Sequence, residues 1–137
     1  MIRREALALA RQWIGTPFHP QASRHGVGCD CAGLVRGVWR ELYGTEPEGL
    51  PVSPWPEHPA NNHLTATLDY WMTETSKPVP GDVMTFRWRH NDPAGHCGIL
   101  APHQRLIHTY WRRAVSETAI TAWWSRRECR AYSFPDR

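Results

Sequence analysis

The sequence lacks any long apolar run, which limits how the chain can meet a membrane. None of its apolar stretches approaches the ~20 residues that a helix needs to cross a bilayer. Its first residues also lack the apolar core of roughly 7–15 residues and the small-residue cleavage site of a secretory signal. We therefore expect a protein made in the cytoplasm without a signal peptide, and no membrane insertion.

Runs of lysine and arginine are also missing, although the chain is mildly basic. The formal net charge is +3, and arginine greatly outnumbers lysine. Basic residues cluster only as the pairs Arg3-Arg4, Arg112-Arg113 and Arg126-Arg127. Nucleic-acid binders typically carry denser basic tracts, so we expect no nucleic-acid partner, whereas the mild positive charge suits some other anionic polymer.

No repeat or low-complexity tract divides the 137 residues. This length buries one ordinary core and is too short for two domains with a linker, so we predict a single domain over residues 1–137. Helical patterns dominate the first half and strand patterns the second, an order that favours the α+β class over alternating α/β.

Apolar periodicity predicts helices at Ala6–Ile14, after Cys31, and around Leu64 to Trp71. Between Tyr43 and Asn61, closely spaced prolines predict an irregular surface loop, in which Trp55 is a candidate wall of a substrate groove. Strands are predicted at Val83–Trp88, Cys97–Ala101, Leu106–Trp111, Ala114–Glu117 and Arg130–Phe134.

Tryptophan is abundant, with eight residues in the chain. Those on helical apolar faces are most simply core residues: Trp13, Trp39 and Trp71. Those near strand ends either line a groove or pack as partly buried side chains, and the pattern leaves both open: Trp88, Trp111, Trp123 and Trp124.

Cysteine occurs four times. In a chain made in the cytosol the thiols are expected to be reduced, although a Cys97–Cys129 bridge stays open. The spacing lacks the C-x₂-C and H-x₃-H patterns of strong zinc sites, so we expect no metal and no cofactor. One alternative remains, a metal-binding structural module that uses Cys29, Cys31, His96 and Cys97.

Cys31 stands at the start of a predicted buried helix. Asp30 or Cys29 is expected near its N-cap, and Gly44 at its end. A helix N-terminus presents unpaired N–H groups and roughly half a positive charge, which favour a thiolate. Cys31 is therefore a candidate nucleophile. One face of this helix is apolar: Leu34, Val35, Val38, Trp39 and Leu42.

Two predicted strands offer a base for that nucleophile. A three-residue hairpin loop between them pairs Ile99 with Ile107 and sets Gly98 opposite His108. His96 then shares a face with Gly98 and is the diagonal neighbour of His108, with Cα atoms roughly 7–8 Å apart. One ring can thus orient the other. A register shifted by one residue would place the rings on opposite faces.

These blocks together resemble the NlpC/P60 family of cell-wall cysteine peptidases, from about Ala6 to His108. The small size and the absence of further domains resemble its phage-associated branch, found in tails and gene-transfer particles. The resemblance implies a papain-like α+β fold, with N-terminal helices on an antiparallel sheet and the nucleophile at a helix N-terminus. The matching blocks are Asp30-Cys31-Ala32-Gly33-Leu34-Val35, Pro80-Gly81-Asp82-Val83, His96-Cys97-Gly98-Ile99 and Ile107-His108.

The same resemblance implies a catalytic triad and a substrate. Cys31 would be the nucleophile, His96 the general base and His108 the residue that orients it, while Asp82 fixes a turn. The reaction would be hydrolysis of peptide bonds in peptidoglycan stem peptides. The partners would be tail or baseplate proteins of a phage or phage-like particle, and the place of action the periplasm or cell wall.

The chain departs from the family pattern at Phe18, where a tyrosine often supplies a hydroxyl near the oxyanion. If that donor matters here, its loss costs roughly 2.7–4 kcal/mol of transition-state stabilisation unless His19 or a backbone N–H substitutes. We predict that Phe18, His19 and Asp30, together with Trp55, contribute to substrate binding. Because of this departure, a non-catalytic wall-binding domain stays open beside the metal-binding alternative.

Overall fold

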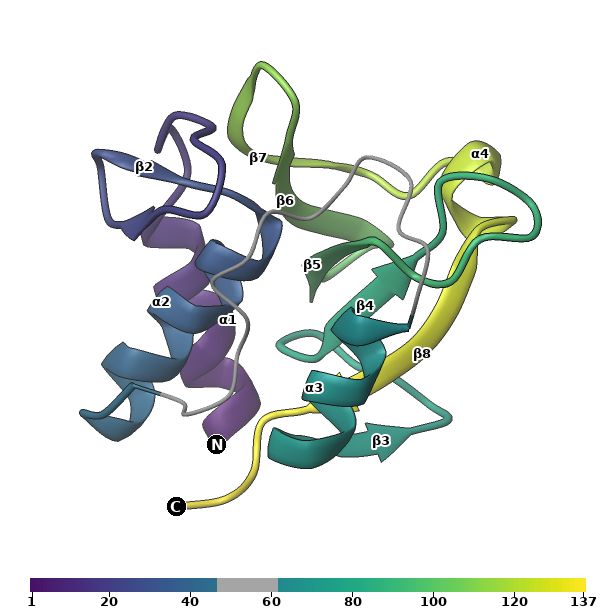
Figure 1. Cartoon of the computed structure of the whole chain (residues 1–137). Helices are drawn as coiled ribbons and strands as arrows, with labels where there is room; N and C mark the ends of the chain where they lie inside the picture. Colours follow the sequence, from purple (N-terminus) through teal and green to yellow (C-terminus); the bar gives the residue numbers. More distant parts are fainter. Residues whose placement is uncertain (47–61) are drawn as a thin grey trace.

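An antiparallel sheet with the two N-terminal helices against one face forms the framework (Figure 1). The fold is seen in a computed structural model, which describes residues 1–46 and 62–137. Trp55 and most of the proline-rich segment lie outside the described residues. The strand order in the sheet is β3-β8-β4-β5-β6-β7.

The helices and the small outer sheet come mainly from the first half of the chain. The helices are α1 (Ile2–Gln12), α2 (Cys31–Tyr43), α3 (His63–Trp71) and the short α4 (Ala122–Ser125). A two-stranded sheet is formed by β1 (Ser23–Arg24) and β2 (Gly28–Cys29). No helix among the described residues is long and apolar enough to span a bilayer.

The main sheet comes from the second half of the chain, which confirms the predicted α+β class. Each predicted strand is present within a few residues of its expected bounds, whereas β1, β2, β3 and α4 were not predicted. The strands are β3 (Thr73–Thr75), β4 (Val83–Phe86), β5 (His96–Ala101), β6 (Arg105–Tyr110), β7 (Arg113–Ala119) and β8 (Glu128–Ser133).

Helix α2 has the ends that its sequence predicts. Asp30 is the N-cap, and its Oδ1 accepts a hydrogen bond from the Gly33 N–H at 2.7 Å. Gly44 ends the helix with a φ of 75°, a left-handed conformation that suits glycine. Of the two N-cap candidates Asp30 is therefore correct, and Cys31 is the first residue of the helix.

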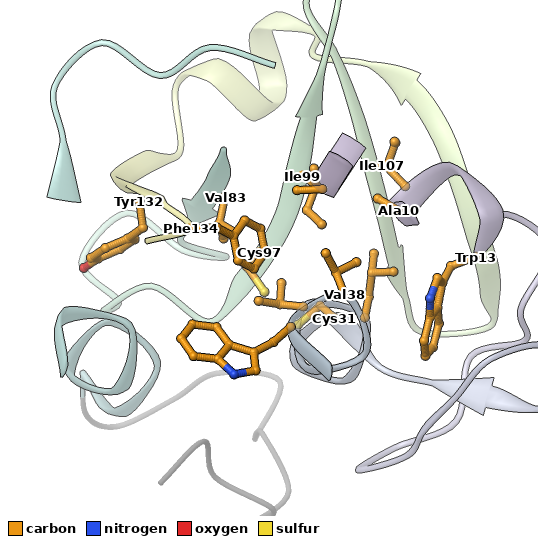
Figure 2. Packing of buried hydrophobic residues seen from close by; sticks show 14 of the residues in the cluster. Ala10, Trp13, Cys31, Val38, Val83, Cys97, Ile99, Ile107, Tyr132 and Phe134 are labelled. Carbon is orange, nitrogen blue, oxygen red and sulfur yellow. The ribbon is translucent and has the colours of Figure 1, made fainter. Parts of the chain in front are cut away.

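Helices α1 and α2 pack closely because a glycine faces a large ring. Trp13, just after α1, is buried against Gly37 of α2, and a Cβ on Gly37 would lie 2.1 Å from the Trp13 ring. This contact sets α2 against the sheet, where the core cluster of Figure 2 forms. Trp13 and Trp39 are core residues as predicted, and Trp71 is partly buried against the same cluster.

The two faces of the sheet carry separate apolar clusters, as alternation along a strand requires. The face toward α1 and α2 contributes Val83, Cys97, Ile99 and Ile107 (Figure 2). The opposite cluster contains Met84, Phe86, Leu106 and Trp124. Consecutive residues of β5 therefore belong to different environments.

Asp82 joins α1 to the start of β4. Its side chain is fully buried; Oδ1 accepts from Arg3 Nε at 2.8 Å and Oδ2 from the Val79 N–H at 2.9 Å. Gly81, beside it, has a φ of 99°, and any Cβ there would clash with the Arg3 carbonyl. The predicted structural role of Asp82 in fixing this turn is confirmed.

Replacing Asp82 tests that role. Asp82→Ala leaves the Val79 N–H without its acceptor, and we expect it to lower the free energy of unfolding by about 2–3 kcal/mol in urea denaturation. Asp82→Asn keeps an oxygen for Val79 and should cost less. A larger loss for Asn than for Ala would contradict this account.

Candidate active site

The Cys31 thiol lies at the N-terminus of α2 beside open backbone donors. Among the described residues, the N–H groups of Cys31 and Ala32 make no backbone hydrogen bond. The next two N–H groups are satisfied, because Gly33 binds the Asp30 side chain and Leu34 binds the Asp30 carbonyl at 2.9 Å. Two unpaired donors thus flank the thiol, as an oxyanion site requires.

His96 and His108 form a hydrogen-bonded pair. The register pairs Ile99 with Ile107, as predicted, which sets Gly98 opposite His108. His96 Nε2 lies 2.9 Å from His108 Nδ1, and each residue is only 1% exposed. Gly98 provides the room, because a Cβ there would lie 2.9 Å from the His108 Cβ. The predicted meeting of the two rings is confirmed.

A third side chain extends this pair. The second nitrogen of His108, Nε2, lies 2.8 Å from the hydroxyl of Thr118 on β7. The other nitrogen of His96, Nδ1, has no hydrogen-bond partner among the residues that the structure describes. The row of polar groups therefore runs from Thr118 through His108 and ends at a free His96 nitrogen.

Aromatic side chains enclose the His96 ring. Trp124 of α4 stacks on it with ring centroids 5.0 Å apart, and Trp88 lies at the same distance in a tilted arrangement. Phe86 and Tyr110 complete the contacts at about 6 Å. The sequence left open whether Trp88 and Trp124 line a groove or pack as buried side chains. In the structure both pack against the His96 ring. No local signal pointed to His96 as their neighbour.

This enclosure keeps both imidazoles neutral. Burial, and secondarily the nearby His108, hold the pKa of His96 well below its ordinary value of 6.5. Burial alone lowers the pKa of His108 to about 4. At neutral pH the pair therefore carries no charge, and each ring has one N–H and one lone pair.

The Cys31 thiol contacts another cysteine, which the sequence did not predict. A hydrogen bond with Cys31, followed by burial, raises the pKa of the Cys97 thiol, so Cys97 keeps its proton. Both cysteines lie among the packed residues of Figure 2. Burial, with Asp30 and Cys31 adding to it, raises the pKa of Cys29 to about 12. No hydrogen bond joins Cys31 to His96 or His108 in the described part of the chain.

Of the predicted substrate-binding residues, the structure describes Phe18, His19 and Asp30, which lie beside the segment that leads into Cys31 and differ in what they contact. Asp30 is occupied at both oxygens, since Oδ2 accepts from the Gln21 N–H at 2.7 Å. Burial raises its pKa despite these bonds. Phe18 is half-buried and meets Trp111 edge-on at 5.9 Å, and His19 is exposed. Their roles in substrate binding, like that of Trp55, stay predictions.

The metal-binding alternative finds no matching geometry. Among residues 1–46 and 62–137, no group of three or more His, Cys, Asp or Glu side chains is placed to hold a metal ion. His96 lies on the face of the sheet opposite Cys97, which separates the four ligands proposed for it. All four cysteines are free, so the Cys97–Cys129 bridge is not formed.

Comparison with solved structures identifies the fold. No family model and no curated protein matches the sequence. The NlpC/p60 domain of the peptidoglycan hydrolase SagA aligns with a TM-score of 0.68 and 19% identity, covering 96% of this chain and 98% of that one. The chain has the NlpC/P60 fold.

Further structures with the NlpC/P60 fold differ in length and in activity. An NLP/P60 family protein similar to lipoproteins, from Staphylococcus aureus, aligns at a TM-score of 0.69 and 16% identity, over 99% of this chain and 42% of that one. RipD from Mycobacterium tuberculosis aligns at 0.60 and 12%, over 97% and 96%. It is described as a non-catalytic NlpC/p60 domain protein adapted to peptidoglycan binding.

The buried histidines of this NlpC/P60 fold predict a pH-dependent stability. Between pH 6.5 and about 4 the unfolded chain protonates His108 while the folded chain does not, so stability falls as the pH falls. At pH 5 this loss amounts to about 2 kcal/mol from His108, with His96 adding in the same direction.

Denaturant titrations at pH 7 and pH 5 measure this loss. In the His108→Asn variant the difference between the two pH values should shrink by about 2 kcal/mol, because the titrating ring is gone. Equal differences in the variant and the native protein would show that His108 is protonated in the folded state.

Proposed function

We propose that this chain is a cysteine endopeptidase that hydrolyses peptide bonds in peptidoglycan stem peptides. The observation that carries the proposal is the buried His96–His108 hydrogen bond, in a fold shared with a peptidoglycan hydrolase. It leaves the other His96 nitrogen without a partner among the residues that the structure describes. The placement of Cys31 at the start of α2, beside two open N–H groups, supports the same assignment.

In the proposed reaction, His96 Nδ1 takes the proton of the Cys31 thiol as the sulfur bonds to the substrate carbonyl carbon. The N–H groups of Cys31 and Ala32 bind the resulting oxyanion. Collapse of this tetrahedral intermediate breaks the C–N bond of the substrate, and the leaving amine takes the proton from His96. Water, deprotonated by His96, then attacks the thioester, which releases the carboxylic acid and returns the proton to the Cys31 sulfur.

The neutral histidine pair decides how the nucleophile would be activated. A His96 pKa far below 6.5 disfavours a standing thiolate–imidazolium pair in the free protein. Proton transfer would instead accompany attack, as general-base catalysis. Cys31 now contacts Cys97, whose side chain lies on the other face of the sheet from that of His96. Because His96 is the first residue of β5 and Cys31 the first of α2, substrate binding would have to turn the thiol around the end of this strand toward His96, in keeping with the loose geometry of many unliganded sites.

The finer proposal places the protein in the tail or baseplate of a phage or phage-like particle, where it helps to penetrate the cell wall. The resemblance of the sequence to the phage-associated branch supports this placement. Particles purified from producing cells should contain the chain, as judged by mass spectrometry with a cytosolic marker as control. Finding it in the cytosolic fraction alone would contradict the placement.

A non-catalytic wall-binding domain is the second candidate. The low exposure of His96 and His108 favours it, as do the Cys31–Cys97 contact and Phe18 in place of a hydroxyl donor. RipD provides a precedent for this use of the fold. This candidate requires binding to peptidoglycan without cleavage.

One experiment separates the two candidates. Isolated peptidoglycans of several chemistries are incubated with the protein, and released muropeptides and new amino termini are followed by mass spectrometry. We expect cleavage, and a loss of at least about a thousandfold in Cys31→Ala, because the nucleophile is gone.

Cys129→Ala is the matched control, since Cys129 lies in β8, is half-buried, and its thiol donates to the Arg127 carbonyl at 3.6 Å. It should retain cleavage. Sedimentation of the protein with peptidoglycan, without any released fragment, would instead establish the wall-binding function.

A further inference from the structure

We propose that Thr118 is a positioning residue that sets the tautomers of His108 and His96, and so keeps His96 Nδ1 free of its proton. Thr118 is outside the Cys-His-polar triad that the sequence suggested. The link to Cys31 chemistry rests on the proposed function, whereas the tautomers themselves are measurable whether or not the protein cleaves anything.

The geometry is a continuous row across three neighbouring strands. Thr118 of β7 pairs with Leu106 of β6, and His108 pairs with Ser116, so Thr118 and His108 share a face as diagonal neighbours. The contacts are 2.8 Å from the Thr118 hydroxyl to His108 Nε2 and 2.9 Å from His108 Nδ1 to His96 Nε2. Both lengths are those of normal hydrogen bonds.

Because both rings are neutral, the row has two self-consistent proton arrangements. In the first, His108 Nε2–H donates to Thr118, His96 Nε2–H donates to His108 Nδ1, and His96 Nδ1 is a lone pair. In the second, the Thr118 hydroxyl donates to His108 Nε2, His108 Nδ1–H donates to His96 Nε2, and His96 carries its proton on Nδ1. Only the first leaves a base for Cys31.

Burial favours the first arrangement. The second leaves the His96 Nδ1–H with no acceptor among the residues that the structure describes and, in a side chain only 1% exposed, with little access to water, whereas an unmet lone pair costs less. In the first, the Thr118 oxygen satisfies the other end of the row, and Thr118 is partly exposed, so water can accept its hydroxyl hydrogen.

Removal of the Thr118 hydroxyl cancels this preference. Without it, the first arrangement has an unpaired donor at His108 Nε2, and the second has one at His96 Nδ1. The two arrangements then become comparable in free energy, and a mixture replaces the single tautomer. The row would also lose its support for the positive charge that His96 acquires during attack.

NMR of protein labelled with ¹⁵N-histidine, at pH 7, tests the tautomers directly. We expect Nε2–H on both His96 and His108 in the native protein, a mixture or Nδ1–H in Thr118→Val, and the native pattern in Thr118→Ser. Ser116→Ala is the matched control, because Ser116 lies on the same strand and face and should leave the pattern unchanged. Should Thr118→Val fail to fold, Thr118→Ala carries the same expectation.

A native protein with Nδ1–H on His96, or a Thr118→Val variant with unchanged tautomers, overturns the inference.

Where the native protein cleaves peptidoglycan, Thr118→Val should lower kcat about tenfold with little change in KM, and Thr118→Ser should restore it. Cleavage with unchanged tautomers leaves the proposed function standing without this inference. The expected tautomers without any cleavage confirm the role of Thr118 and remove the proposed function.

Discussion

The pairing of β5 with β6 is the constraint on which the rest of the site depends. Because side chains alternate along a strand, this register sends His96 and His108 to one face of the sheet and Cys97 to the other. The first face supplies the imidazole pair and its aromatic enclosure. The second receives α2, and with it Cys31 against Cys97. A slip of one residue would exchange these environments and separate the rings.

Burial acts on the site in two opposing ways. It holds the imidazoles in one orientation, with Trp124 stacked on His96, and it excludes competing hydrogen-bond partners. The same burial lowers the pKa of both rings, so the pair is a weaker base than free histidine and its protonation costs folding free energy. Burial thus fixes the orientation of the two rings and at the same time weakens them as bases.

This chain shares its fold with solved structures at 12–19% identity, and within the chain a small set of contacts holds that fold together. Asp30 caps α2, Gly37 admits Trp13 between the helices, and Asp82 ties α1 to β4. Each acts over a short distance and leaves most surface positions free to vary. Similarity at this level identifies the fold, and not the reactivity of the thiol or the histidines.

The sequence by itself determined the local features: a helix that begins near Cys31 and ends at Gly44, the hairpin register and the meeting of His96 with His108. It left Asp30 and Cys29 as two candidates for the N-cap, and the structure chose Asp30. The local features follow from residue periodicity, capping chemistry and a short loop, all of which act between near neighbours. Only the tertiary structure decided that Thr118 completes the histidine row, that Trp124 covers His96, and that Cys31 contacts Cys97. The cysteines, and likewise His96 and Trp124, are far apart in the chain, and Thr118 lies on a strand outside the predicted hairpin. No local sequence pattern specifies how packing brings these residues together.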